Sequence, residues 1–160
     1  MGYMDTLAAI VLIFGAAVAV LICAFVINAL HTDATVTSTL GNESTAYLQT
    51  GENVMFMFDI LLIFVYFGSV AASVITSFFV RSHPVFFVVG IMYMLIIVAI
   101  TSVFSNAYIE LGSQAGLDAI ANQFQWIYFF FLHLPKIAFI SMLAIAIALH
   151  GKAAETPGGY

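Results

Sequence analysis

Apolar and polar positions along this chain fall into long blocks, without the short repeat of a helix or strand that is half exposed to water. The four apolar blocks, each about 20 residues long or longer, cover approximately 7–30, 54–80, 85–104 and 124–149. An α-helix rises 1.5 Å per residue, so each block is long enough to cross the ~30 Å hydrocarbon core of a bilayer. We therefore predict an all-α membrane protein, with four transmembrane helices forming two hairpins in a single domain over residues 1–160.

The polar segments between the blocks predict the orientation of the helices. Residues 31–53 and 105–123 contain no Lys or Arg, whereas Arg81 lies between the second and third blocks and Lys152 follows the fourth. Because basic residues stay on the side of synthesis, we expect both termini and the turn at Arg81 on the cytoplasmic or interior side. The two longer segments are then the outer loops.

Composition narrows the classes of function. Hydrophobic residues make up 64% of the chain and charged residues 7%, against about 25% charged in a typical water-soluble domain. Three basic residues are too few for a nucleic-acid partner, which needs a cluster of Lys and Arg. No stretch has the residues of a hydrolytic, nucleotide-binding or redox motif, and no pair of histidines has metal-ligand spacing. We expect neither catalysis by the chain alone nor a metal or cofactor.

Small residues recur at a spacing of four in the first two blocks, as Gly15 with Ala19 and Gly68 with Ala72. Such pairs let helix backbones approach closely in lipid, where burial of apolar surface gives no driving force. We interpret them as helix-packing positions.

Two charged residues lie inside apolar blocks. Asp59 is about five residues, or ~8 Å, from the outer end of the second block, and Lys136 lies in the outer part of the fourth. A charge in the membrane is costly and is expected to face protein and find a partner. Since Lys136 can extend several Å outward, the sequence predicts a buried Asp59–Lys136 ion pair. This pair would fix helix packing or, alternatively, form part of a gate or proton relay.

Below Asp59, the second block carries hydroxyl groups along one helical face, at Tyr66, Ser69, Ser73 and Ser77. This stripe could line a narrow water path. Bonding of the hydroxyls to backbone or to a neighbouring helix is the more common arrangement.

The fourth block is interrupted by His133-Leu134-Pro135-Lys136. Pro135 removes one backbone N–H and predicts a kink near the outer third of the helix.

Three features follow one another in the C-terminal part of the chain: Asn122-Gln123-Phe124, then Leu132-His133-Leu134-Pro135, then an apolar run closed by His150-Gly151-Lys152. Over these about 30 residues the chain resembles small integral membrane proteins of viruses that have an internal lipid membrane. The resemblance contains no diagnostic motif. It implies a virion membrane component whose loops contact capsid or vertex proteins.

Three functions fit these patterns. The first is a non-catalytic membrane subunit that packs within a larger assembly, with lipid, membrane subunits or capsid subunits as partners. The second is a small ion- or proton-conducting channel subunit, which would need a homo-oligomer to enclose a pore. The third is a membrane-perforating protein of the holin type, which is disfavoured because the tail 151–160 has only one basic residue.

Overall fold

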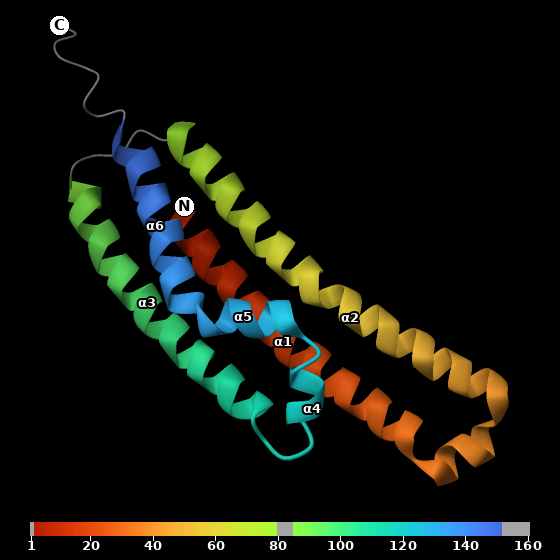
Figure 1. The fold of residues 1–160 in the computed structure, drawn as a ribbon. Helices are drawn as coiled ribbons and strands as arrows, with labels where there is room; N and C mark the ends of the chain where they lie inside the picture. Colours follow the sequence, from red (N-terminus) through yellow and green to blue (C-terminus); the bar gives the residue numbers. More distant parts are fainter. Residues whose placement is uncertain (1, 80–84, 152–160) are drawn as a thin grey trace, which may run out of the picture.

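The computed structural model describes residues 2–79 and 85–151, and all regular secondary structure in these ranges is helical. Figure 1 shows a bundle of long helices with a bent segment at one side. In chain order the helices are α1 (Gly2–Thr32), α2 (Ala34–Phe79), α3 (Val85–Gly112), α4 (Asp118–Ala121), α5 (Gln125–Leu132) and α6 (Leu134–His150).

Three of these helices are long and apolar enough to cross a membrane, namely α1, α2 and α3. The fourth candidate span is the pair α5 and α6, which meet at a bend of 69°. The described part of the chain is therefore all-helical with three candidate membrane spans, or four where the bent pair counts as one.

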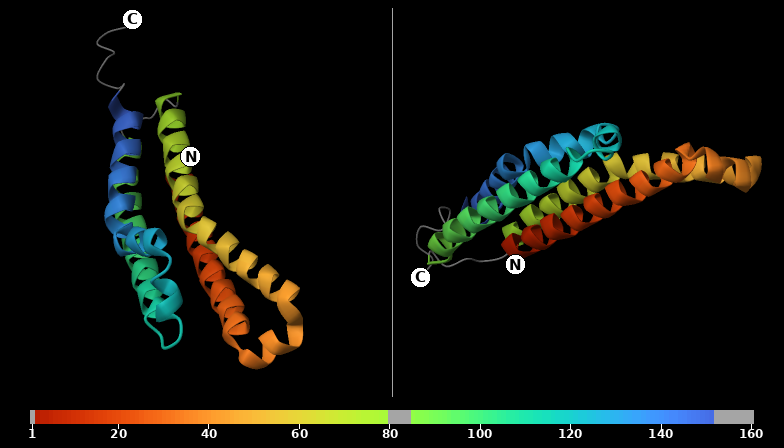
Figure 2. Two further views of the ribbon diagram at one scale, coloured as in Figure 1. Left: turned by 45° about the vertical axis from the view of Figure 1, so that its right-hand side comes forward. Right: turned by 90° about the horizontal axis from the view of Figure 1, so that it is seen from below.

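The ends of the long helices gather at two ends of the bundle. The start of α1, the end of α2, the start of α3 and the end of α6 lie toward one end, and the α1–α2 and α3–α5 connections lie toward the other (Figures 1 and 2). Arg81 and Lys152, on which the predicted orientation rests, lie outside the described residues. The side of the membrane that each end faces stays a prediction.

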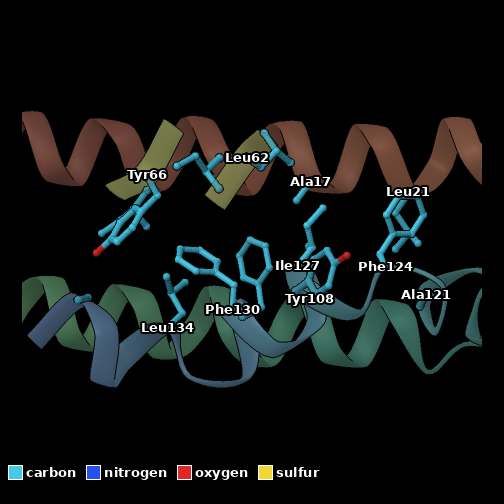
Figure 3. Packing of buried hydrophobic residues seen from close by; sticks show 14 of the residues in the cluster. Ala17, Leu21, Leu62, Tyr66, Tyr108, Ala121, Phe124, Ile127, Phe130 and Leu134 are labelled. Carbon is cyan, nitrogen blue, oxygen red and sulfur yellow. The ribbon is translucent and has the colours of Figure 1, made fainter. Parts of the chain in front are cut away.

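Each long helix buries one narrow stripe of residues spaced three or four apart. On α1 the stripe is formed by Ile10, Ile13, Ala17, Leu21 and Ala24. This spacing is the knobs-into-holes repeat of helices that pack side by side. Figure 3 shows Ala17 of α1 facing Ile127 of α5 and Tyr108 of α3, and Leu21 beside Phe124, the residue before α5. Most of the remaining positions on each helix carry large apolar side chains that are exposed on the surface of the bundle, as expected for helices surrounded by lipid.

The small-residue pairs predicted to pack helices lie on the outer surface instead. Gly15, Ala19, Gly68 and Ala72 are all exposed, and a side chain added at either glycine would meet no atom within 4 Å. The reason is their angular position, because residues two apart point to roughly opposite sides of a helix. Gly15 and Ala19 each lie two positions from the buried Ala17. The prediction that they pack helices within this chain is wrong.

The segment expected as an outer loop, 31–53, is mostly helical. The Asp33 carboxylate accepts the backbone N–H groups of Thr35 and Val36, at 2.8 and 3.3 Å, and so caps the start of α2. Hydroxyl groups then bond to carbonyls one turn earlier, as Thr39 does to Thr35 at 2.7 Å. Composition rich in Ser and Thr suits both a loop and a self-bonded helix, which is why the sequence did not distinguish them.

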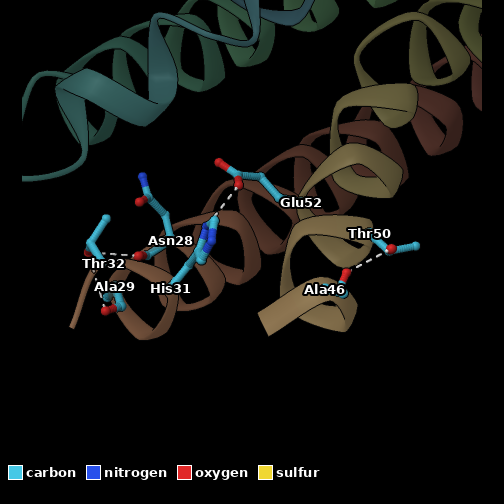
Figure 4. A network of polar contacts seen from close by, with 7 residues as sticks. All are labelled: Asn28, Ala29, His31, Thr32, Ala46, Thr50 and Glu52. Carbon is cyan, nitrogen blue, oxygen red and sulfur yellow. Dashed lines mark hydrogen bonds and ion pairs between the residues drawn. The ribbon is translucent and has the colours of Figure 1, made fainter. Parts of the chain in front are cut away.

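This part of α2 doubles back along the end of α1 and projects past α3 and α4 (Figure 2). Gly41, with φ of 74°, interrupts the helical backbone there, in a conformation that favours glycine. Farther along, Oε2 of Glu52 on α2 lies 3.6 Å from Nδ1 of His31 on α1 (Figure 4). The connection between the first two candidate spans is thus a helical hairpin.

The second expected loop, 105–123, is also partly helical. Helix α3 continues to Gly112, and the short α4 packs against its end. A side chain at Gly112 would come within 3.2 Å of the Ala121 Cβ, so the close approach of α4 to α3 requires glycine or a small shift of α4.

Candidate functional site: the bent α5–α6 pair

The bend between α5 and α6 lies beside Pro135, in the first turn of α6. A prolyl nitrogen has no hydrogen to donate to the carbonyl four residues earlier, which belongs to Phe131. Ser105 of α3 replaces that donor, because its hydroxyl donates to the Phe131 carbonyl at 2.7 Å. The predicted kink at Pro135 is therefore present, and a neighbouring helix satisfies the backbone that it frees.

The other end of α5 is held by Asp59. Its Oδ1 accepts the N–H of Ile127 at 2.7 Å, and its Oδ2 accepts the N–H of Trp126 at 3.2 Å. These are free donors of the first helical turn, and the preceding residue, Phe124, provides no side-chain cap. The carboxylate of α2 thus caps α5 from outside, where the helix dipole also favours a negative charge.

Asp59 is 7% exposed, whereas Lys136 is exposed on the outer surface of α6. Among the residues that the structure describes, no ion pair joins them, and the predicted buried Asp59–Lys136 pair is wrong. Depth alone suggested the pair, but depth does not fix the rotation of a side chain about its helix axis. Lys136 lies two residues from both Leu134 and Ala138, which are buried, and so points away from the bundle.

The hydroxyl stripe on α2 faces the interior, with Tyr66, Ser73 and Ser77 buried and Ser69 half-buried. Its hydroxyls have local partners. Ser69 donates to the Tyr66 carbonyl at 2.8 Å, and Ser77 to the Ser73 carbonyl at 2.7 Å. Two of the four stripe hydroxyls, those of Ser69 and Ser77, therefore bond to their own helix.

Tyr66 extends this bonding across the bundle to α6. Its hydroxyl donates to Ser141 Oγ at 3.1 Å, and Ser141 in turn donates to the Ile137 carbonyl at 2.8 Å. Together with the Asp59 cap and the Ser105 bond, this gives three polar ties that join α2 and α3 to the bent pair.

Aromatic rings fill the space between the ties. Phe131 of α5 stacks on Tyr108 of α3 with ring centroids 4.3 Å apart, and meets the edge of Phe14 of α1 at 5.9 Å. The ring of its neighbour Phe130 packs edge-on against the Tyr66 ring, with centroids 5.0 Å apart. Figure 3 shows Phe130 between Tyr66 and Tyr108 in the packed cluster. One short helix therefore contacts all three long helices through its aromatic face.

The described residues contain no group of three or more His, Cys, Asp or Glu side chains able to hold a metal. His133, at the bend, packs its ring edge-on against Phe129 at 4.6 Å. What this arrangement does chemically is hold a broken helix in place.

Sequence reasoning found Asp59 and Pro135 but missed their partners, Ser105 and the backbone N–H groups at the start of α5. The sequence contained one signal for the N–H groups at the start of α5. The start of α5 carries no Ser, Thr, Asp or Asn at its cap position, so a helix beginning there inside an apolar block needs an acceptor from elsewhere.

Searches of family models, curated proteins and solved structures find no match to this chain.

Proposed function

We propose that the chain is a non-catalytic integral membrane subunit with four spans, which packs within a larger membrane-embedded assembly. The observation that carries the proposal is the use of its interior polar groups. Asp59, Ser105 and Tyr66 bond to the bent pair, and Ser69 and Ser77 bond to their own helix. The first three groups act as structural ties between helices, and aromatic rings fill the space between these ties.

The outer surface supports the same proposal. It is apolar over most of its area, and it presents the small residues of α1 and α2 outward: Gly15, Ala19, Gly68 and Ala72. In lipid, small outward residues allow a neighbouring helix to approach closely. The partners we propose are other membrane subunits or, following the resemblance of the C-terminal part, capsid or vertex proteins around a virion membrane.

The direct test is purification of the chain from its native membrane in mild detergent, followed by identification of what accompanies it. We expect membrane or capsid proteins in fixed stoichiometry. A Gly15→Leu, Gly68→Leu variant should lose them, whereas Leu12→Ile, which changes another exposed α1 position, should keep them. A chain that purifies as a monomer from every preparation would contradict the proposal.

The four-span arrangement with both termini inside has its own test. Single cysteines at Ser38, Ser82 and Ser113, in a Cys23→Ala background, are labelled with an impermeant thiol reagent in sealed vesicles. We expect Ser38 and Ser113 to react from one side and Ser82 from the other. Reaction of all three from the same side would overturn this topology.

A channel subunit is the second candidate, because Asp59, Tyr66, Ser73 and Ser77 are buried on one face of α2. Flux of protons or ions into liposomes distinguishes the two functions. The packing proposal predicts that the purified chain conducts no more than empty liposomes. Robust flux that Ser73→Ala, Ser77→Ala abolishes would establish the channel instead.

A further inference from the structure

Lys136 lies at the edge of an apolar groove on the outer surface of the bundle. The groove has a volume of about 470 Å³ and lies between α3 and α6, where it is lined by Val98, Pro135, Lys136, Phe139 and Ile140. Every lining side chain except Lys136 is apolar, and the groove exposes no polar surface, so Lys136 lines it through its aliphatic stem. The exposed lysine can then carry its ammonium group beyond the apolar floor.

The charge of Lys136 has no partner in the part of the chain that the structure describes. It makes no ion pair there, and the first turn of α6 contains no acidic residue. The positive end of a helix dipole disfavours a cation at this position. The surroundings of Lys136 are therefore positive and uncompensated, inside a segment that we propose spans the membrane.

The depth of Lys136 suits a headgroup. It lies about 14 residues, or ~21 Å, from the end of α6 at His150. If His150 marks one boundary of the ~30 Å hydrocarbon core, the far boundary is roughly 9 Å away, and the flexible lysine stem extends across much of that distance.

We propose that this groove binds one anionic phospholipid, with an acyl chain along Val98, Phe139 and Ile140 and the phosphate paired with Lys136. The inference rests on the membrane setting proposed above, not on the packing function. Charge complementarity selects an anion, and the apolar floor selects an amphiphile. The groove has the size of a small-ligand site, which is about 300–1,000 Å³, whereas a stable protein interface buries more than about 1,000 Å².

The test compares phosphatidylglycerol with phosphatidylcholine of identical acyl chains. The full-length protein is purified with an equal mixture of the two lipids and examined by native mass spectrometry at increasing collision energy. We expect the wild type to retain phosphatidylglycerol preferentially. Lys136→Gln should reduce that preference about fivefold, the contribution typical of one lysine near an anionic lipid surface, and Lys136→Arg should keep it.

Two further variants separate the charge from the groove. Lys152→Gln removes the same charge from the tail and should leave the preference unchanged. Ile140→Trp keeps Lys136 but fills part of the groove, and should weaken retention of both lipids. Because Lys136 and Ile140 are exposed, these changes are expected to leave the helical content and the monodisperse elution of the protein intact, which circular dichroism and gel filtration check.

Equal retention of the two lipids by the wild type would overturn the proposal, as would an unchanged preference in Lys136→Gln. A third contrary result concerns a protein partner. If a zero-length carbodiimide crosslinker in native membranes joins Lys136 to a carboxylate of a second polypeptide, that polypeptide occupies the site and the lipid does not.

Discussion

The two charged residues within the apolar helices have opposite surroundings. Asp59 is buried and accepts two backbone N–H groups at the start of α5. Lys136 is exposed beside an apolar groove, with no ion-pair partner among the described residues. A charge that the chain satisfies internally stabilises its own fold. A charge directed outward is left to its surroundings, and for Lys136 we propose that an anionic lipid pairs with it.

Removal of the buried charge at Asp59 should have the largest effect on the free energy of unfolding. In Asp59→Ala the N–H groups of Trp126 and Ile127 lose a charged acceptor, and a hydrogen bond to a charged group contributes about 1.5–3 kcal/mol. We expect the free energy of unfolding in detergent to fall by about 2–4 kcal/mol. Asp118→Ala, at an exposed acidic residue, is the matched control and should change it by less than about 0.5 kcal/mol. Equal effects of the two substitutions would show that the Asp59 cap does not stabilise the fold.

A double-mutant cycle then tests whether the two charges are independent. Because Asp59 and Lys136 do not form a pair, the effects of Asp59→Leu and Lys136→Met on unfolding should add to within about 0.5 kcal/mol. A true buried pair behaves differently, since removal of both charges recovers much of the loss caused by removal of one. Recovery of more than about 1 kcal/mol in the double variant would restore the ion pair that the sequence suggested.

Loss of the Ser105 hydroxyl, which replaces the donor missing at Pro135, should have an intermediate effect on the free energy of unfolding. Ser105→Ala removes the hydroxyl that donates to the Phe131 carbonyl, and a net loss of about 1 kcal/mol is expected. In a Pro135→Ala background the N–H of residue 135 becomes available to that carbonyl. The same serine substitution should then cost less, as measured by unfolding of all four variants. An equal cost in both backgrounds would show that Ser105 and Pro135 act separately.

These charges and ties also show how far the sequence alone could lead. The four apolar blocks predicted the helices of the bundle because burial in lipid requires long, continuous apolar segments. The cost of a buried charge predicted that Asp59 faces protein. The rotation of each helix could not be predicted, since an almost uniformly apolar helix has no polar face to orient it. For this reason we predicted that Lys136, Gly15 and Gly68 face the interior of the bundle, whereas all three are exposed on its surface.

The partner of Asp59 was missed because it consists of backbone N–H groups, which every residue except proline carries. The segment 31–53 was expected as a loop because the bonds of Thr39 and Asp33 to nearby backbone are invisible in composition. In both regions the structure depends on side chain-to-backbone bonds, which the apolar and polar blocks of the sequence do not show.

The smallest effect concerns the exposed carboxylate of Asp33. The N–H groups of Thr35 and Val36 hold the pKa of Asp33 below its ordinary value. Its capping contribution is therefore present above about pH 4, the unfolded value, and is lost as the pH falls through the lower folded value. We expect NMR signals from the first turn of α2 to shift toward coil at acid pH, and Asp33→Asn to reduce this response. A pH response at Thr35 that Asp33→Asn leaves unchanged would contradict this assignment.

The contrast between the two charges can be measured without any substitution at either residue. Solid-state NMR of the protein in bilayers, with ¹³C-labelled aspartate and ¹⁵N-labelled tryptophan or lysine, reports the distances from the Asp59 carboxyl carbon. The structure predicts strong dephasing by the amide nitrogen of Trp126, the single tryptophan of the chain, whose N–H bonds Oδ2 at 3.2 Å, and much weaker dephasing by the Lys136 Nζ. Strong dephasing by the Lys136 Nζ, with none by the Trp126 amide, would show that the two charges are paired inside the bundle and would contradict the account.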